Sequence, residues 1–212
     1  MFGIQDLPLF VLAGLLLNFT PGPDSLLVIT RSAAQGWRAG SAAACGICAG
    51  TFVHIFAAAL GLSALLATSS LAFTVVKYLG VAYLLYVGLT MLFGRRSGSA
   101  QPANASASQL PYRRIFLQGF LTNVLNPKVA LFFLAFMPQF IAPQSPNKAA
   151  AFVLLGVIFN TTGTLWCHVL ALTTAFASHK LRASERVAEW LTRAIGAVFF
   201  SFGIRLALSQ RG

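Results

Sequence analysis

Two hydrophobic stretches decide the fold of this chain: Asn18-Phe-Thr-Pro21-Gly22-Pro23-Asp24 and Asn123-Val-Leu-Asn126-Pro127-Lys128. In each stretch a charged residue directly follows a proline, and the two charges are opposite in sign. Proline inside a helix frees backbone groups, which a membrane protein must satisfy internally. An ionised side chain in hydrocarbon costs at least about 2.5–3.5 kcal/mol, so it must face a partner or a wet cavity. A charge beside a helix break, found twice, is typical of the binding site of a membrane transporter.

The composition indicates an all-α integral membrane protein. Of the 212 residues, 57% are hydrophobic and only 9% are charged, whereas a soluble domain carries about 25% charged residues. The net charge of +11 would suit a nucleic-acid partner, but the basic residues lie between the apolar runs, as the positive-inside rule requires. We therefore expect a lipid bilayer as the surroundings and no nucleic-acid partner.

Six apolar runs are long enough to be transmembrane spans, since a span needs about 20 apolar residues. They are residues 7–30, 39–67, 71–93, 115–141, 149–176 and 188–208. Residues 94–114 are rich in Ser, Ala, Gln and Pro and read as a flexible linker. The prediction is a single transmembrane domain over 1–212, divided into a first half (1–93) and a second half (115–212).

The distribution of basic residues predicts the orientation in the membrane. Nine Lys and Arg residues lie in the three odd-numbered connections, against four on the other face or near it. The positive-inside rule then places the odd-numbered connections in the cytoplasm and both termini outside.

The two halves resemble each other span by span. Three matches occur in the same order: Gly22-Pro23-Asp24 with Asn126-Pro127-Lys128, Gly50-Thr51 and His54 with Gly163-Thr164 and His168, and Lys77, Gly80 and Gly88 with Arg193, Gly196 and Gly203. A repeat of three spans inserts its second copy upside down, and inverted repeats place the substrate site at their interface. The alternative is that Gly and Pro recur because they are common in membrane helices.

Asp24 is a candidate substrate contact. Pro21 and Pro23 around Gly22 should unwind the first span, which restarts near Asp24 or Ser25. The N–H groups of the restarted half-helix suit a carboxylate, and Asp24 with the freed carbonyls suits an ammonium group. Alternatively, Asp24 caps the new half-helix.

Lys128 needs a counter-charge, because it follows Pro127 in the middle of the fourth span. The chain has four acids, and Asp24 is the one expected within the membrane. The two charges either pair across the repeat interface and bind substrate, or form a structural pair that holds the broken helices together. The three asparagines beside the breaks are expected to satisfy freed backbone groups. The candidate site therefore comprises Asn18, Pro21, Gly22, Pro23, Asp24, Asn123, Asn126, Pro127 and Lys128.

His54 and His168 are candidates for proton coupling, since histidine titrates near neutral pH; the alternative is a packing role. Cys45-x-x-Cys48 could exchange disulfides or bind metal, but it overlaps Gly46-x-x-x-Gly50, which is a close-packing signature. We expect helix packing there and no metal site. The sequence contains no nucleotide-binding loop and no nucleophile–base pair, so neither a cofactor nor enzymatic activity is predicted.

Three segments carry a family resemblance: residues 18–50, 77–92 and 118–140. They contain Pro21-Gly22-Pro23, a K-x-x-G-x-x-Y-L-x-x-x-G run from Lys77 to Gly88, and Asn126-Pro127-Lys128. In these motifs the chain resembles the lysine exporter (LysE/RhtB) family. The resemblance implies a bacterial inner-membrane exporter of amino acids that is driven by an ion gradient.

The sequence thus favours secondary-active export of amino acids by alternating access around Asp24 and Lys128, with a coupling ion such as H⁺. Neutral substrates are favoured over basic ones, because few acids are available to meet a cationic side chain. Other readings are an exporter of a divalent cation or small metabolite, a membrane thiol–disulfide electron carrier, and a structural scaffold. A homo-oligomer is left open.

Overall fold

The computed structural model describes residues 2–62 and 109–177, together with isolated positions between 71 and 89 and between 197 and 204. Within the two long described segments the chain is helical, and its extended pairing is an isolated bridge between Ile4 and Ile141. The elements are α1 (Leu7–Phe19), α2 (Pro23–Gln35), α3 (Trp37–Phe56), the π-helix η1 (Ala57–Leu62), α6 (Tyr112–Val124), α7 (Pro127–Leu131), the π-helix η2 (Phe132–Phe136), the 3₁₀ helix η3 (Met137–Phe140) and α8 (Lys148–Ala177).

The described helices supply two to four candidate spans. Trp37–Gly61 and Lys148–Phe176 are each long and apolar enough to cross a bilayer. Two further pairs pass that test when each is taken as one span: α1 with α2, bent by 51°, and α6 with the helices from Pro127 to Phe140, bent by 44°. The helix breaks predicted at Pro21–Pro23 and at Pro127 are confirmed. The predicted spans 71–93 and 188–208 lie mostly outside the described residues, as do Lys77 and Gly88, so the six-span arrangement stays a prediction.

Three predicted boundaries move. After the first break α2 begins at Pro23 rather than at Asp24 or Ser25, because the fixed φ of proline suits the first helical position. The same helix continues to Gln35, beyond the expected limit of residue 30. The linker predicted to reach residue 114 ends earlier, since α6 begins at Tyr112 behind an extended Pro111.

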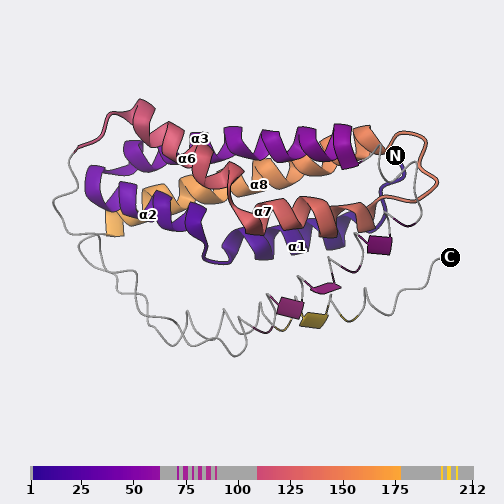
Figure 1. Ribbon diagram of the computed structural model, residues 1–212. Coiled ribbons are helices and arrows are strands. Elements are labelled where there is room, and N and C mark those ends of the chain that lie inside the picture. The colour runs from indigo at the N-terminus through magenta and orange to yellow at the C-terminus, as the bar shows by residue number, and fades with distance from the viewer. Residues whose placement is uncertain are drawn as a thin grey trace.

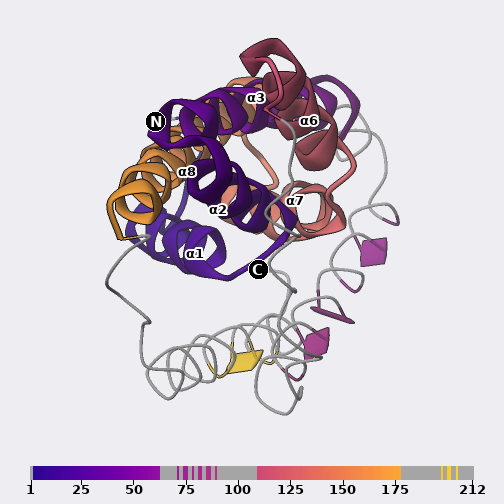
Figure 2. The same ribbon diagram turned by 90° about the vertical axis from the view of Figure 1, so that its left-hand side faces the viewer.

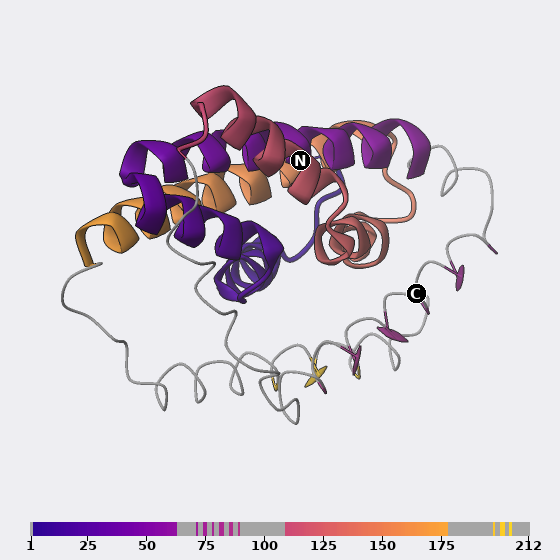
Figure 3. The ribbon, with the colours of Figure 1, turned by 60° about the vertical axis from the view of Figure 1, so that its left-hand side comes forward.

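The two bent pairs run in opposite directions along one bundle. In Figure 1 the chain passes along α1 and α2 one way and along α6 and α7 the other way, and α3 and α8 are likewise antiparallel. Viewed end-on, α2 lies centrally, where it contacts α3, α6 and α8 (Figure 2). Figure 3 shows α1 and α7 side by side beneath α3 and α8. This arrangement brings the two helix breaks together in the middle of the bundle.

The connections gather at two opposite ends of the bundle. At one, here called the N-terminal end, the Gln5 amide donates to the Phe140 carbonyl (2.9 Å) and the Ala142 amide to the Gly3 carbonyl (2.8 Å). At the other, here called the Gln35 end, the Gln35 side-chain amide donates to the Leu110 carbonyl (3.2 Å). The α2–α3 turn and the start of α6 therefore share one end, as the predicted topology requires.

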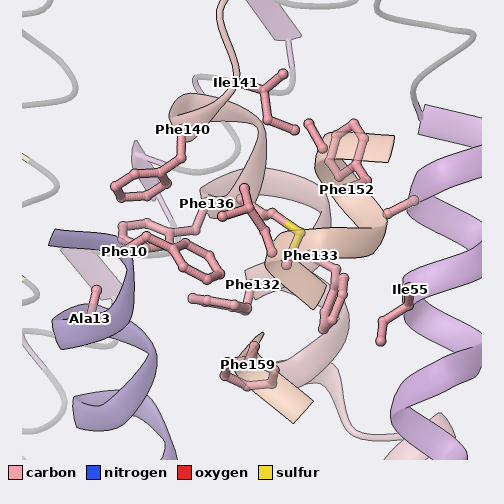
Figure 4. Close-up of a cluster of buried hydrophobic side chains, with 14 of the residues drawn as sticks. Phe10, Ala13, Ile55, Phe132, Phe133, Phe136, Phe140, Ile141, Phe152 and Phe159 are labelled. Atoms are coloured by element: carbon pink, nitrogen blue, oxygen red, sulfur yellow. The ribbon is translucent and has the colours of Figure 1, made fainter. Parts of the chain in front are cut away.

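Aromatic side chains fill the core toward the N-terminal end. Phe10 of α1 packs on Phe132 and Phe140, with ring centroids 5.9 and 5.3 Å apart, and Phe132 stacks on Phe159 of α8 at 4.5 Å. These rings are buried, and Figure 4 shows them pointing toward one another between three helices. The cluster thus joins α1, α7–η3 and α8 into one packed layer.

Glycines let α3 and α6 cross in near contact. A Cβ at Gly46 would meet the Phe116 carbonyl, one at Gly119 would meet the Ala43 carbonyl, and one at Gly50 would lie 2.8 Å from the Phe120 carbonyl. These contacts confirm the close-packing interpretation of Gly46-x-x-x-Gly50.

We expect Gly46→Ala to destabilise the bundle by about 1–3 kcal/mol, because the added methyl meets backbone that cannot rotate away. Gly61→Ala is the matched control, since its Cβ would meet no described atom within 4 Å. Thermal unfolding of the purified protein in detergent measures the difference. Equal melting temperatures for the two variants would contradict the close crossing.

Candidate functional site

Residues around the two helix breaks line a small cavity of about 40 Å³. Its lining includes four of the nine predicted site residues: Asn18, Asp24, Asn123 and Lys128. Gly22 lies next to it, because a Cβ there would lie 3.2 Å from the Lys128 ammonium nitrogen. The charged residues after both breaks, which are 104 positions apart in sequence, therefore face one space.

Lys128 bonds to the end of the first half-helix. Its Nζ donates to the carbonyl oxygens of Leu17 and Thr20, both at 3.0 Å. Pro21 has no N–H to donate to the Leu17 carbonyl, and α1 ends before the Thr20 carbonyl can gain a helical partner. A cation at a helix C-terminus is also favoured by the dipole. The ammonium group that the sequence led us to expect at these carbonyls is thus supplied by the protein itself.

Asp24 bonds to the end of the other half-helix. Its Oδ2 accepts a hydrogen bond from the Asn123 side-chain amide at 2.8 Å. The alternative that Asp24 caps α2 is wrong: Gly22 occupies the cap position, and no side chain bonds there. Asp24 lies in the first turn of α2, where the positive end of the helix dipole favours its carboxylate.

The two charged side chains are therefore held reciprocally. The residue after each break is bonded to the half-helix that precedes the other break. Asp24 and Lys128 also attract each other electrostatically across the cavity that they share. A direct pair between them stays a prediction.

The asparagines divide into two roles. Asn126 caps α7, with its Oδ1 accepting from the Lys128 backbone amide at 3.0 Å, as expected of a residue that satisfies freed backbone. Asn123 and Asn18 instead link helices: Asn123 Oδ1 accepts from the Thr51 hydroxyl at 3.2 Å, and Asn18 Nδ2 donates to the Thr162 hydroxyl at 3.3 Å.

Each linking asparagine also packs against a glycine of the opposite half. A Cβ at Gly50 would lie 3.0 Å from the Cβ of Asn123, and a Cβ at Gly163 would lie 3.0 Å from Asn18 Oδ1. Gly50 and Gly163 are the two glycines that the internal repeat aligns.

The two histidines differ in their surroundings. His54 Nε2 lies 3.0 Å from the backbone carbonyl of Asn123, the residue that binds Asp24. His168 Nδ1 lies 2.9 Å from the Thr164 carbonyl within its own helix. His54 also lines a second cavity of about 330 Å³, whose described lining is otherwise apolar. Of the two histidines, His54 is the one that contacts a hydrogen-bond partner of Asp24.

Sequence reasoning missed the contribution of α8. Asn160, Thr164, Trp166 and Cys167 line the cavity, and the available signal was their position around Gly163 of the repeat. Asn160 also donates to the Cys48 carbonyl at 3.2 Å, which gives Cys48 a role in packing α3 on α8.

The LysE type translocator family matches residues 15–210 of the chain. The chain belongs to this family. An uncharacterised membrane protein of Pseudomonas aeruginosa is 35% identical over 97% of the chain and 96% of its own length. Leucine efflux proteins of Salmonella typhimurium and Salmonella typhi are each 29% identical over 99% of the chain and 98% of their own. No solved structure matches significantly. This translocator is a transporter and not an enzyme.

We expect Asn123→Ala to destabilise the translocator more than Asn18→Ala. The first variant removes a hydrogen bond to a buried carboxylate, worth about 1.5–3 kcal/mol, and the second a bond between neutral groups, worth about 0.5–1.5 kcal/mol. Melting temperatures of both variants in the same detergent make the comparison. A larger loss for Asn18→Ala would contradict the assignment of Asn123 as the principal partner of Asp24.

Proposed function

We propose that this translocator exports amino acids, neutral ones in preference to basic ones, across the bacterial inner membrane. Membership of the LysE type family and nearly full-length similarity to leucine efflux proteins support the substrate class. The observation that carries the proposal is the cavity lined by both the Asp24 carboxylate and the Lys128 ammonium group, which follow the two helix breaks. An amino acid is a zwitterion, so its ammonium group can meet the Asp24 carboxylate and its carboxylate can meet the Lys128 ammonium group.

The neutral preference follows from the lining of the cavity. Ile47, Val129 and Phe159 offer an apolar surface for a side chain. Asp24 is the one acid in the described lining, and the substrate's own ammonium group engages it. A cationic side chain would therefore be desolvated without a counter-charge.

Transport requires the site to change shape. The cavity has room for only a few water molecules, each of which needs about 10–15 Å³ of such space, whereas ligand pockets usually span about 300–1,000 Å³. An amino acid therefore enters only when the helices around the breaks separate. We infer alternating access, in which separation at one end of the bundle accompanies closure at the other.

The contacts at the breaks support the inverted-repeat architecture that we propose for the whole chain, with repeats 1–93 and 115–212. Asn18, before the first break, packs against Gly163, and Asn123, before the second break, packs against Gly50. The two halves therefore make the same kind of contact with each other. The antiparallel course of the two bent pairs in Figure 1 is what an inverted repeat requires.

The Gln35 end of the bundle is proposed to face the cytoplasm, which leaves both termini outside. Arg31, Arg38, Arg113 and Arg114 lie on the elements that meet at that end, in keeping with the positive-inside rule. A proton gradient is the proposed driving force, and His54 is the proposed coupling group.

We expect Asp24→Asn and Lys128→Gln each to slow efflux about tenfold or more, since each removes a charge that meets the substrate. Cells preloaded with radiolabelled neutral and basic amino acids provide the measurement, with membrane levels checked for every variant. Asp6→Asn and Lys148→Gln are matched controls, because Asp6 is exposed and Lys148 bonds to the Ser145 carbonyl at the N-terminal end.

Efflux that survives both substitutions would mean that the two charges only hold the helix breaks together. Failure of the wild type to export any amino acid would favour a divalent cation or another metabolite as cargo. A thiol–disulfide carrier would instead lose its activity in a Cys45→Ala/Cys48→Ala variant, which we expect to export normally.

We expect His54→Gln to reduce the stimulation of efflux by an imposed proton gradient, and His168→Gln to leave it unchanged. The reason is that His54 contacts the Asp24 network and His168 bonds within its own helix. Proteoliposomes with a set pH difference provide the measurement. Equal responses of the two variants would remove His54 as the coupling group.

A further inference from the structure

Three buried polar atoms around the cavity have no hydrogen-bond partner among the described residues. They are Oγ1 of Thr164 and Nε1 of Trp166 on α8, and Oδ1 of Asp24 on α2, whose carboxylate otherwise interacts with the side chains of Asn123 and Asn126. Native proteins leave few buried polar atoms unpaired, because each costs stability. Three such atoms on the lining of one cavity, contributed by two helices, indicate a place where a polar ligand binds.

The chemistry of these atoms matches the two main-chain groups of an amino acid. The indole N–H of Trp166 can only donate, and the Asp24 carboxylate can only accept. A substrate that satisfies both must carry an acceptor for the indole and a donor for the carboxylate. The α-carboxylate and the α-ammonium group of an amino acid are such a pair, and the Thr164 hydroxyl can serve either.

We propose that Trp166 is a substrate-binding residue whose Nε1–H donates to the α-carboxylate, while Asp24 Oδ1 accepts from the α-ammonium group. The proposal rests on the amino-acid export proposed above and adds a recognition rule to it: the transporter requires a free carboxylate as well as an amine. The indole adds a directed donor for the carboxylate beside the charge of Lys128, whose ammonium group also donates to the carbonyls of Leu17 and Thr20.

The packing of Trp166 suits this role. Its ring lies 4.5 Å from that of Phe19, the last residue of α1, so the indole bridges α8 and the helix that ends at the first break. If α1 and α8 moved apart to open the cavity, the Trp166 indole N–H, which donates to the carboxylate in this proposal, would move as well.

The test compares a free amino acid with its amide, using Trp166→Phe in the full chain. Phenylalanine keeps an aromatic ring against Phe19 and removes the N–H together with part of the indole; the loss of packing affects leucine and leucinamide alike. Proteoliposomes are loaded with leucine or leucinamide over a range of concentrations, and the half-saturating concentration of efflux is measured. We expect this concentration to rise about tenfold for leucine, as for the loss of a hydrogen bond to a charged group, and to rise less for leucinamide, whose neutral amide oxygen accepts a weaker hydrogen bond.

Two variants serve as references. Asp24→Asn should raise the half-saturating concentration for both compounds, because both carry the ammonium group. Trp37→Phe, at an exposed position at the start of α3, should change neither. Where Trp166→Phe inserts poorly, the rise in melting temperature of the purified variant on adding leucine or leucinamide gives the same comparison.

The outcomes separate this inference from the proposed function. If the wild type exports leucine but Trp166→Phe affects leucine and leucinamide equally, or neither, the indole has a structural role or binds a water molecule, and the inference fails. If the wild type exports neither compound nor any other amino acid, the proposed function fails as well.

Discussion

The two hydrogen bonds from the Lys128 ammonium group to the carbonyls of Leu17 and Thr20 are the interaction on which the rest of the structure depends. Pro21 prevents α1 from continuing, and the carbonyls at its end cannot turn to water inside a membrane. A cation on another helix resolves this at the negative end of the α1 dipole. The same two bonds give the Lys128 ammonium group the acceptors that it needs. The helix end and the lysine therefore satisfy each other.

A hydrogen bond likewise links the helix that precedes the second break to a residue that follows the first. Asn123, at the end of α6, donates to Asp24 in the first turn of α2. Each broken helix is consequently hydrogen-bonded to the charged residue that follows the break in the other. Such a joint differs from an apolar contact, because a small zwitterion could meet both of its charges. In the proposed function, substrate binding would therefore loosen the joint without leaving either charge unpaired.

The sequence was sufficient to locate both breaks and both charges, because proline acts on the backbone locally and a charge in an apolar run is conspicuous. It was also sufficient to assign Gly46-x-x-x-Gly50 to helix packing. The partners of the charges could not be found in this way. That Lys128 reaches backbone carbonyls, and Asp24 an asparagine amide, depends on which helices lie side by side. Trp166 lies beside Gly163 of the repeat, but a tryptophan in an apolar helix is ordinary until its N–H is seen to lack a partner among the described residues.

The two ends of the bundle differ in a way that bears on the direction of opening. Toward the N-terminal end, Phe159 lines the cavity and also stacks on Phe132, which packs on Phe10. Opening on that side must pull apart rings contributed by both broken helices, and it would expose a large apolar area. Toward the Gln35 end, α2 and α6 meet in a smaller apolar cluster that includes Val28 and Ile115, and through a hydrogen bond of 2.9 Å from the Arg31 guanidinium to the Gln118 side chain. Water can replace such a bond at little cost, and the side chains of this cluster are smaller than the stacked rings, half of the buried ones being alanine. The larger aromatic cluster therefore closes the N-terminal end more firmly, and the Gln35 end is the one that would separate with less loss of free energy.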